Sequence, residues 1–417
     1  MKILLWTQHF WPEEFIVNEL AQALQHQGNS VEVLTAKPNY PTGQIYSGYQ
    51  ALGLEIEKYK QIKVYRIPII PRNLGFEKIS KKFLKSLGLI SNYLSFIISG
   101  CIFAPYALAG KTYDLIFVYA TSPLLQAIPA IVLAKLKGVP LVLWVQDLWP
   151  QALVSTGYIR NKYLISIINS LIKSIYRHSS LILIQSEQYL GLIQPQLEPN
   201  AQVEYFPNPS HDYQKNIDDR LLPKSLIDSI KKQFSIVFTG NIGSVQDLKT
   251  LLFAAKTLLQ KEPKIKIFII GEGSEATALR AFIDQHKLVN VIMPGFLSKK
   301  AMPAVYAAAS VLYLGLKDNT DLNATLPSKM PGYLSAAKPI LACMNGVGAE
   351  MVNLLKIGEA CPAGDDQALL IAILKLFNLT ISERQILGDK ARKHYLAHFA
   401  LDKLTNLLME KCSNLIK

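Results

Sequence analysis

Gly240 and Gly243 stand where a strand-like run, FSIVFTG, gives way to a helical run, VQDLKTLLFAAKTLL. Glycines at such a junction leave backbone N–H groups pointing outward, where they can bind a phosphate at the helix N-terminus. A tight connection with positive φ also requires glycine, so a single glycine does not distinguish a phosphate site from a simple turn. Together, the two glycines and Asn241 between them predict a site for a nucleotide diphosphate.

Three further stretches follow strand-like runs in the same half: GEGSEA, GFLSKK and LKDNTDLNATLPSK. The carboxyl ends of parallel strands meet at one edge of a sheet, so we expect these stretches to converge with the glycine turn. Gly271, Gly273 and Ala276 have the spacing of a dinucleotide fingerprint, G-x-G-x-x-A. However, no acidic residue ends the next strand, near 291–293, where such a site needs one for the ribose. We therefore assign Gly271 and Gly273 to the diphosphate site.

Lys329, in LPSK, is the cation that we expect to face the diphosphate. A helix that begins with Pro327 and Ser328 would add its dipole to the ammonium charge. Lysine has the unfavourable sign for a helix N-terminus, which indicates a compensating anion, although an ordinary surface lysine is the alternative. Asp318 and Asp321 lack D-x-D spacing and are expected to bind sugar or solvent. We predict no metal site.

The first half offers a carboxylate between two indoles, in LVLWVQDLWPQ. Asp147 follows a strand, where it would be desolvated without a partner, so core packing explains it poorly. It could accept a hydrogen bond from a sugar hydroxyl or act as a base, with Trp144 or Trp149 as a stacking wall. Capping of the next helix is the alternative.

Two more polar stretches follow strands of the first half. The first contains His9, Glu13 and Glu14, and the second, KPNYPTG, contains Asn39 and Tyr40. Both lie where open α/β sheets bind ligands. His9 alone is as consistent with a structural role as with a functional one.

Short β-branched runs alternate with longer helical runs along the chain. Helix-length segments separate consecutive strands, without hairpin turns, which predicts parallel sheets with helical crossovers. The strands are expected near 2–7, 30–35, 62–67, 115–119, 141–145, 181–185 and 203–206, and, after a restart at Phe234, near 266–270, 289–293, 311–314 and 339–342. The helices of the first half are expected at 13–27, 77–109, 123–136, 162–178 and 187–194.

A length of 417 residues suits two domains of about 200 residues each. A polar, proline-containing stretch, FPNPSHDYQKNIDDR, separates them. We expect a first domain at 1–206, a linker at 207–221 and a second domain at 222–394. One long helix, 382–416, is expected to close the chain, and its end, about 395–417, to pack back on the first domain. Two doubly wound halves that face each other would bind the ligand between their sheets.

The chain has 44 Lys and Arg against 31 Asp and Glu, a net charge of +13. This excess favours an anionic partner: nucleic acid, a phosphorylated substrate or an acidic membrane surface. Lys78, Lys81, Lys82 and Lys85 alternate with apolar residues, which predicts either a membrane-surface helix or a solvated helix over a core. The segment 87–110 is apolar, but its polar residues and glycines favour a buried or monotopic helix over a transmembrane span.

The four cysteines are far apart and lack metal-ligand spacing, which is typical of reduced cytosolic proteins. The N-terminus, MKILLWTQHF, runs directly into a strand. We therefore expect no secretory signal.

Taken together, these motifs resemble the retaining, metal-independent glycosyltransferases of family 4. The resemblance covers nearly the whole chain and rests on WPEEFIVNELAQALQHQGNSVEVLTAKPNYP, VQDLWP, TGNIG, GEG, GF, LPSKMPGYLSAAKPIL and GEACPAGDDQAL. Within the family, the chain is most similar to the bacterial branch that builds surface polysaccharides, including transferases of N-acetylfucosamine. The resemblance implies the α/β GT-B fold: two facing Rossmann-like domains with parallel sheets and an interdomain cleft.

The sequence departs from the family pattern at several positions. The family's donor loop has Gly-Arg and a lysine five residues further on, and here Asn241 and Gln246 occupy those two places. The E-x7-E pair of the family falls on Ala324 and Gly332, so neither carboxylate is present. The histidine that many members use near the reacting carbon falls on Gln146.

The resemblance therefore implies that backbone N–H groups of Gly240–Gly243, with Lys329, neutralise the leaving diphosphate. Glu350 matches the region that meets the donor's ribose, although a glutamate is also favourable at a helix start. The expected catalytic residues are Asp147 and Lys329. The expected donor-binding residues are Gly240, Asn241, Gly243, Gly271, Gly273, Asn323, Ser328 and Glu350. The expected acceptor-binding residues are His9, Glu13, Glu14, Asn39, Tyr40, Gln146 and Trp149.

The function that the resemblance implies is retaining transfer of a sugar from a nucleotide sugar to a polyprenyl-diphosphate-linked saccharide in O-antigen, capsule or exopolysaccharide synthesis. The donor is expected to be a UDP-N-acetylamino sugar such as UDP-N-acetylfucosamine. We expect no cofactor and no nucleic acid partner. The expected location is the cytoplasm, at the inner face of the plasma membrane, on an anionic lipid surface. Two alternatives are a GT-B UDP-sugar epimerase and a non-catalytic GT-B protein that binds sugar nucleotide.

Overall fold

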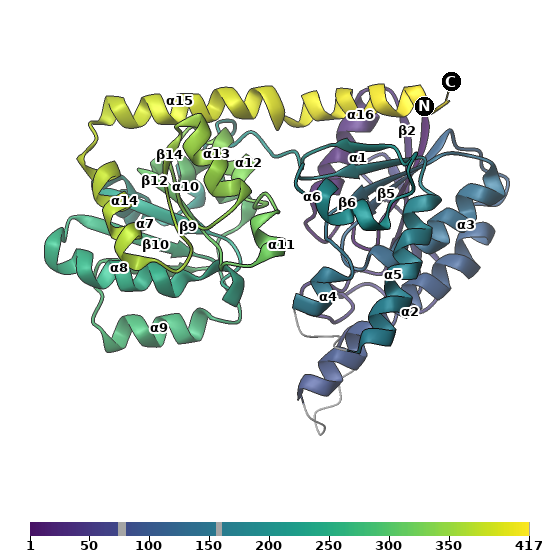
Figure 1. The fold of residues 1–417 in the computed structure, drawn as a ribbon, viewed down its shortest axis with the longest axis horizontal. Helices are drawn as coiled ribbons and strands as arrows, with labels where there is room; N and C mark the ends of the chain where they lie inside the picture. Colours follow the sequence, from purple (N-terminus) through teal and green to yellow (C-terminus); the bar gives the residue numbers. More distant parts are fainter. Residues whose placement is uncertain (74–80, 156–160, 417) are drawn as a thin grey trace. The chain divides into compact units, whose positions relative to one another are not determined.

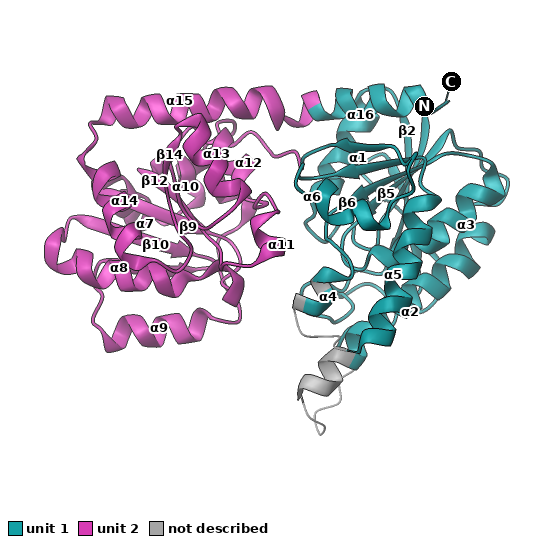
Figure 2. Ribbon diagram, viewed as in Figure 1, with its two compact units in different colours: residues 1–207, 404–417 teal, residues 208–403 magenta. Residues whose placement is uncertain are grey.

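A computed structural model describes residues 1–73, 81–155 and 161–416 of the chain. The chain forms two compact units (Figure 2). Unit 1 combines Met1–Pro207 with Leu404–Lys417, and unit 2 is Asn208–Lys403. Each unit is an α/β layer structure built on its own sheet (Figure 1).

Unit 1 contains an eight-stranded sheet with the order β3-β4-β2-β1-β5-β6-β7-β8. Its strands are β1 (Lys2–Trp6), β2 (Ser30–Ala36), β3 (Glu55–Tyr59), β4 (Ile62–Ile67), β5 (Leu115–Ala120), β6 (Leu141–Val145), β7 (Leu181–Ile184) and β8 (Val203–Tyr205). All neighbours pair in parallel except β3, which is antiparallel to β4. The expectation that hairpins are absent is therefore wrong at this edge. The two-residue turn, at Lys60 and Gln61, contains no Gly or Asn, the residues that usually mark a hairpin.

Three helices of unit 1 connect strands that succeed one another in the same direction across the sheet. They are α2 (Lys81–Ala107), α3 (Ala127–Lys137) and α5 (Lys162–Arg177). Right-handed crossovers place such helices on one face, and α3 contacts both α2 and α5 there (Figure 1). The β1-to-β2 connection, α1 (Ile16–His26), runs in the opposite direction and therefore covers the other face. Shorter helices in this unit are α4 (Gln151–Ser155) and α6 (Tyr189–Ile193).

Helix α2 falls within the helix expected at 77–109. Of the four lysines expected on its basic face, Lys78 lies outside the described residues, and Lys81, Lys82 and Lys85 belong to the first turns of α2. By length and composition, Leu87–Ala107 could cross a membrane, and 33% of its most apolar window is buried in the protein. One such helix is weak evidence for a span.

Unit 2 contains a six-stranded, fully parallel sheet with the order β11-β10-β9-β12-β13-β14. Its strands are β9 (Phe234–Thr239), β10 (Ile265–Ile270), β11 (Val291–Gly295), β12 (Val311–Gly315), β13 (Ile340–Cys343) and β14 (Gly358–Cys361). Its helices are α7 (Lys224–Lys232), α8 (Leu248–Lys261), α9 (Ala276–Gln285), α10 (Met302–Ala308), α11 (Thr320–Asn323), α12 (Met330–Ser335), α13 (Val347–Leu355), α14 (Asp366–Asn378) and α15 (Ile381–His398). Separate apolar clusters cover the two faces of the sheet, which explains why its central strands are apolar throughout.

The end of the chain is two helices rather than the single helix expected at 382–416. α15 ends at His398, and α16 (Leu401–Ile416) begins after Phe399 and Ala400. The break has a local cause, because Ala400 forms a β-bridge with Ser210 and Phe399 is buried. From Leu404 onward α16 belongs to unit 1, where Asn406 accepts a hydrogen bond from Gln27 at 2.7 Å and Lys411 forms an ion pair with Glu204.

Candidate functional site

The glycine turn of unit 2 uses most of its own backbone donors. The N–H of Gly240 donates to the carbonyl of Ile270 at 2.9 Å, and that of Ile242 to the carbonyl of Glu272 at 2.9 Å. The N–H of Gly243 donates to the side chain of Gln246 at 3.0 Å. The predicted backbone cradle is therefore wrong for these three groups. The sequence could not show this, because the acceptors come from the next loop and from a glutamine side chain.

Close backbone packing explains the glycines of this edge. A Cβ on Gly271 would lie 1.9 Å from the carbonyl oxygen of Gly240, and one on Gly273 would lie 2.4 Å from that of Ile242. The two loops therefore stack backbone on backbone, which only glycine allows. Gly240 itself has φ +123°, and a Cβ there would lie 2.5 Å from Lys329 Cε.

Lys329 lies directly beside this turn, as expected for a cation of the site. Its ammonium nitrogen lies 4.0 Å from the centroid of the Phe238 ring and forms no ion pair or hydrogen bond with the described residues. Desolvation by burial lowers the pKa of Lys329 to about 7. The helix begins at Met330 rather than at the expected Pro327 and Ser328, because Lys329 is the N-cap of α12 and Pro331 lies in its first turn. An uncompensated, half-buried cation marks this point as an anion site.

Buried tyrosines hold α12, and with it Lys329, against the end of β9. The hydroxyl of Tyr333 accepts a hydrogen bond from the N–H of Thr239 at 3.1 Å, and Thr239 Oγ1 bonds the hydroxyl of Tyr306 at 2.8 Å. Arg392 of α15 donates to the carbonyl of Ser335 at 3.0 Å, at the other end of α12. Gly332 packs against the ring of Tyr213, 3.0 Å from the place of a Cβ, so a larger side chain would displace that ring.

The remaining donor candidates form a polar rim with fewer contacts. Asn323 donates to Asp318 at 2.8 Å. Hydrogen bonds from Asn323 and Asn345 lower the pKa of Asp318, so it stays charged. Ser328 and Asn241 are exposed. Glu350 is exposed in the first turn of α13.

In unit 1, Glu13 lies at the centre of a buried polar network. Its Oε1 accepts hydrogen bonds from the N–H groups of Asn39 at 2.7 Å and Tyr40 at 2.6 Å. Its Oε2 lies 2.9 Å from Nδ1 of His9. Nε2 of His9 in turn lies 2.9 Å from a guanidinium nitrogen of Arg72. Because arginine can only donate, His9 accepts at Nε2 and donates from Nδ1 to the carboxylate.

Arg72 joins this network to the other predicted group, around Asp147. Its guanidinium lies 5.7 Å from the centroid of the Tyr93 ring, which meets the Trp149 ring edge to face at 6.3 Å. The indole of Trp149 donates to Ser122 Oγ at 3.1 Å, and Ser122 donates from its N–H and its hydroxyl to Asp147 Oδ2 at 2.9 and 2.7 Å. The structure thus brings His9, Glu13 and Asp147 to one edge of the sheet, at the carboxyl ends of the parallel strands.

Several first-half expectations change in detail. Trp144 is fully buried and donates to the carbonyl of Phe206 at 3.0 Å, so it is no stacking wall. Trp149 is 3% exposed, and its indole supports Ser122 rather than an open sugar site. Gln146 is buried with its amide nitrogen unpaired among the described residues. Glu14 is exposed and lies outside the hydrogen-bonded network.

Sequence reasoning missed Arg72, Ser122 and Asn92. Ser122 lies just after β5, and Arg72 lies in the loop that follows β4, at the same carboxyl edge as the residues that were predicted. That position was a usable signal. Asn92, which accepts from Gln8 at 2.8 Å and donates to the carbonyl of Ile70 at 2.7 Å, lies within α2 and carried no such signal.

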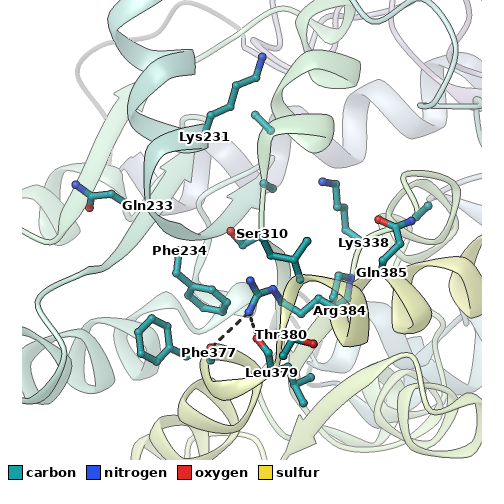
Figure 3. A pocket seen from close by; sticks show the side chains of 15 residues that line it. Lys231, Gln233, Phe234, Ser310, Lys338, Phe377, Leu379, Thr380, Arg384 and Gln385 are labelled. Atoms are coloured by element: carbon teal, nitrogen blue, oxygen red, sulfur yellow. Dashed lines mark hydrogen bonds between the residues drawn. The ribbon is translucent and has the colours of Figure 1, made fainter.

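Unit 2 also contains a cavity at the amino ends of its strands, at the opposite edge of its sheet from the glycine turn (Figure 3). Lys231, Lys338 and Arg384 are its cations, and none of its lining residues is acidic. Two of them have partners, because Lys231 pairs with Asp219 at 2.5 Å and Arg384 donates to the carbonyls that end α14. We therefore assign these two cations structural roles.

Comparison with known proteins agrees with the two-unit architecture. Residues 14–209 match the model of the glycosyl transferase 4-like domain, and residues 225–394 match that of glycosyl transferases group 1. WcaI of Escherichia coli K12, named as a colanic acid biosynthesis glycosyl transferase, is 27% identical over 352 residues, which cover 80% of this chain and 81% of WcaI. WbjE of Pseudomonas aeruginosa, named as a glycosyltransferase, is 24% identical over 79% of this chain and 81% of its own.

Two solved structures have the same fold at low identity. Sucrose-phosphate synthase of Thermosynechococcus elongatus has a TM-score of 0.72 at 15% identity, over 99% of this chain and 98% of that one. HepE of Anabaena, in complex with UDP, has a TM-score of 0.67 at 15% identity over the whole of both chains. The two family models match both units, and the site residues lie at the carboxyl edges of two parallel sheets. This chain therefore belongs to the family 4 glycosyltransferases and has the GT-B fold.

Proposed function

We propose that the protein transfers a sugar, with retention of configuration, from a UDP-activated N-acetylamino sugar to a polyprenyl-diphosphate-linked saccharide. The observation that carries this proposal is Lys329, a half-buried ammonium group without an anionic partner among the described residues, beside the glycine turn. A donor diphosphate would supply the missing charge. No metal ion takes part in the proposed reaction.

The proposed role of Lys329 is to stabilise the leaving diphosphate. Negative charge grows on that group as the bond to the sugar breaks, so a cation fixed beside it favours the transition state over the ground state. The N–H groups of Gly240, Ile242 and Gly243 are engaged within the protein, which leaves the ammonium group as the main charged contact. The rim residues Asn323, Ser328 and Glu350 are proposed to bind the sugar and ribose hydroxyls.

On the acceptor side, Asp147 is proposed to orient the attacking hydroxyl. Ser122 occupies only its Oδ2, and Oδ1 has no hydrogen bond within the described residues, so that oxygen can accept from a sugar. Arg72 is proposed to bind the acceptor's diphosphate, because its guanidinium contacts no carboxylate of the described residues. Glu13 and His9 hold Arg72 in place and are positioning residues.

Two relatives support the finer parts of the proposal. A HepE structure contains UDP, which supports UDP as the nucleotide. The name of WcaI refers to colanic acid biosynthesis, which supports an acceptor that belongs to surface polysaccharide assembly in O-antigen, capsule or exopolysaccharide synthesis. A lipid-linked acceptor implies a cytoplasmic protein held peripherally at the inner face of the plasma membrane.

A nucleotide panel and a transfer assay test the proposal. UDP should raise the melting temperature more than GDP or TDP at equal concentration, because a bound ligand stabilises the folded state by the logarithm of its saturation. With UDP-N-acetylfucosamine and an undecaprenyl-diphosphate-linked sugar, the product should keep the donor's anomeric configuration by NMR. Conversion of the UDP-sugar without any acceptor would identify an epimerase instead. Tight UDP binding without turnover across a donor and acceptor panel would indicate a non-catalytic binding protein.

A further inference from the structure

We infer that unit 1 docks on an anionic membrane through the outer surface of α2, α3 and α5, with the exposed side of α2 inserted among the lipids. The inference deepens the proposed function, since a lipid-linked acceptor must be reached at a bilayer. The observations that support the inference do not depend on that function. They are a row of exposed apolar side chains, the absence of acidic residues from the ranges of α2, α3 and α5, and the position of Arg72.

Five large apolar residues recur every fourth position along one side of α2. Their exposed fractions rise along the helix, from 49% at Ile90 to 78% at Tyr106. We call this row the α2 ridge; its residues are Ile90, Leu94, Ile98, Ile102 and Tyr106. Residues four apart are neighbours on a helix surface and each step turns by about 40°, so the row forms a ridge inclined to the helix axis. It spans about 24 Å along the axis at 1.5 Å per residue. A row of this length forms a continuous apolar strip on the surface of unit 1.

The opposite side of α2 is the one that packs on the protein. Asn92, Phe96, Ala104 and Leu108 are fully buried, and a Cβ on Gly100 would lie 2.8 Å from the ring of Pro129 in α3. These positions lie two residues, or about 200°, from the α2 ridge. The helix is therefore apolar on both sides, whereas a surface helix of a globular protein is polar on its outer side.

The three helices of this surface carry only positive charge. The ranges of α2, α3 and α5 contain no Asp or Glu. Their basic residues with described side chains are Lys135, Lys137, Lys162, Lys173 and Arg177. Of these, Arg177 lies 4.0 Å from the carboxylate of Glu198. Helix α5 adds exposed apolar side chains at Tyr163, Leu164, Ile167 and Leu171. On the other face of the sheet, α1 contains Glu19, and the part of α16 that belongs to unit 1 contains Glu410. Cations around an apolar strip are what an anionic bilayer surface attracts.

The packing of α2 argues for an interfacial position rather than a span. A spanning helix needs lipid or apolar protein around its circumference, yet Asn92 of α2 bonds Gln8 and the carbonyl of Ile70 inside unit 1. An interfacial helix immerses only its outer side, about 5–10 Å deep. The α2 ridge meets this requirement while the buried side stays on the sheet.

The position of Arg72 connects this surface with the acceptor site. Its carbonyl oxygen lies 2.0 Å from the place of a Cβ on Gly88, so its backbone touches α2 near the start of the exposed row. Its guanidinium lies 5.7 Å from the centroid of the Tyr93 ring. A lipid whose chains contact the α2 ridge could therefore present its diphosphate to Arg72 without leaving the membrane.

Vesicle flotation of the full-length protein tests the inference without any sugar substrate. We expect flotation with phosphatidylglycerol vesicles, and at least a roughly tenfold lower partition coefficient for the triple variant Leu94→Ser, Ile98→Ser, Ile102→Ser. The matched control is Val289→Ser, Ile371→Ser, Ile381→Ser, which removes three exposed apolar residues of unit 2 and should float like the wild type. Both variants should keep the wild-type melting temperature and UDP affinity, because exposed substitutions cost little stability.

Charge is tested separately on α5. Replacement of Lys162, Lys173 and Arg177 by Gln should weaken binding to phosphatidylglycerol vesicles by roughly fivefold per charge and leave binding to phosphatidylcholine vesicles unchanged. Equal flotation of the ridge variant and the wild type would overturn the inference. A wild type that stays off vesicles but dimerises through the ridge, with the ridge variant monomeric, would overturn it too. Loss of vesicle binding with unchanged UDP affinity separates this inference from the proposed function.

Discussion

The ammonium nitrogen of Lys329 lies 4.0 Å from the centroid of the Phe238 ring, on the side of β9 where the chain turns at Gly240. The face of an aromatic ring attracts a cation, which partly offsets its burial. It does not neutralise the charge, and the pKa of Lys329 remains lowered to about 7. The charge of Lys329 is thus only partly compensated within the protein, and a bound diphosphate would supply the opposite charge.

Replacing Lys329 by Met should weaken UDP binding and stabilise the ligand-free protein. A charge-assisted contact contributes about 1.5–3 kcal/mol, so affinity for UDP should fall at least about tenfold. The melting temperature without UDP should rise, because Met keeps the apolar stem and removes the buried charge. Calorimetric titration and thermal unfolding measure the two effects. Unchanged UDP affinity would remove Lys329 from the site.

The pH dependence of donor binding should follow the same group. With a folded-state pKa of about 7, Lys329 of the free protein loses its proton as the pH rises from 6 to 8. A bound diphosphate favours the protonated form, so binding at pH 8 should take up close to one proton, and affinity should fall with rising pH. Titration of UDP-sugar in buffers of different ionisation enthalpy measures the uptake. The Lys329→Met variant is the control and should take up none.

The same depressed pKa predicts how stability varies with pH. The unfolded chain has an ordinary lysine pKa near 10.4, so between about pH 7 and 10 it binds a proton that the folded protein lacks. The contribution of Lys329 is therefore unfavourable below pH 7 and disappears as the pH rises through this window. Denaturant unfolding of the wild type and of Lys329→Met should give curves that converge towards pH 10. A constant difference between them across this range would contradict the assigned pKa.

The sequence predicted the parallel sheets and the edge of the site because these depend on local patterns. Apolar runs bounded by glycines located β9, β10 and β12, and the residues after such strands share one edge in any parallel sheet. The lone cation at Lys329 was identifiable for the same reason. Edge strands β3 and β14 were missed, since a charged strand such as EIEKY has little apolar signal.

What the sequence could not predict depends on pairings between distant segments. The N–H groups of the glycine turn were expected to be free, and their acceptors at Ile270 and Glu272 became visible only in three dimensions. Likewise, Arg72 reaches His9 across 63 residues. The break between α15 and α16 depends on a bridge from Ala400 to Ser210, far away in the chain. Propensity alone gives no information on such partners.

Replacing Arg72 by Gln should impair use of the acceptor and leave the donor site intact. Glutamine can still donate to His9 Nε2 but carries no charge for a diphosphate. We expect the KM for a diphosphate-linked acceptor to rise about tenfold or more, while the affinity for UDP stays unchanged. Arg72→Lys should recover part of the loss by restoring the charge. An unaltered acceptor KM in Arg72→Gln would make Arg72 a structural residue of the network.

Asp147 is tested by comparison with Ser122, its hydrogen-bond partner. Asp147→Asn keeps the shape but replaces an anionic acceptor by a neutral amide, so kcat should fall by about a hundredfold or more if the carboxylate assists the attacking hydroxyl. Ser122→Ala removes the hydroxyl bond of 2.7 Å to Oδ2 and the acceptor of the Trp149 indole N–H, and it leaves the backbone bond of 2.9 Å. Because Asp147 keeps its carboxylate and this backbone contact, kcat should fall less than about tenfold. Steady-state transfer rates at saturating donor and acceptor separate the two. Equal losses in both variants would mean that Asp147 acts only by holding the loop at Ser122, and that the attacking hydroxyl is oriented by another group.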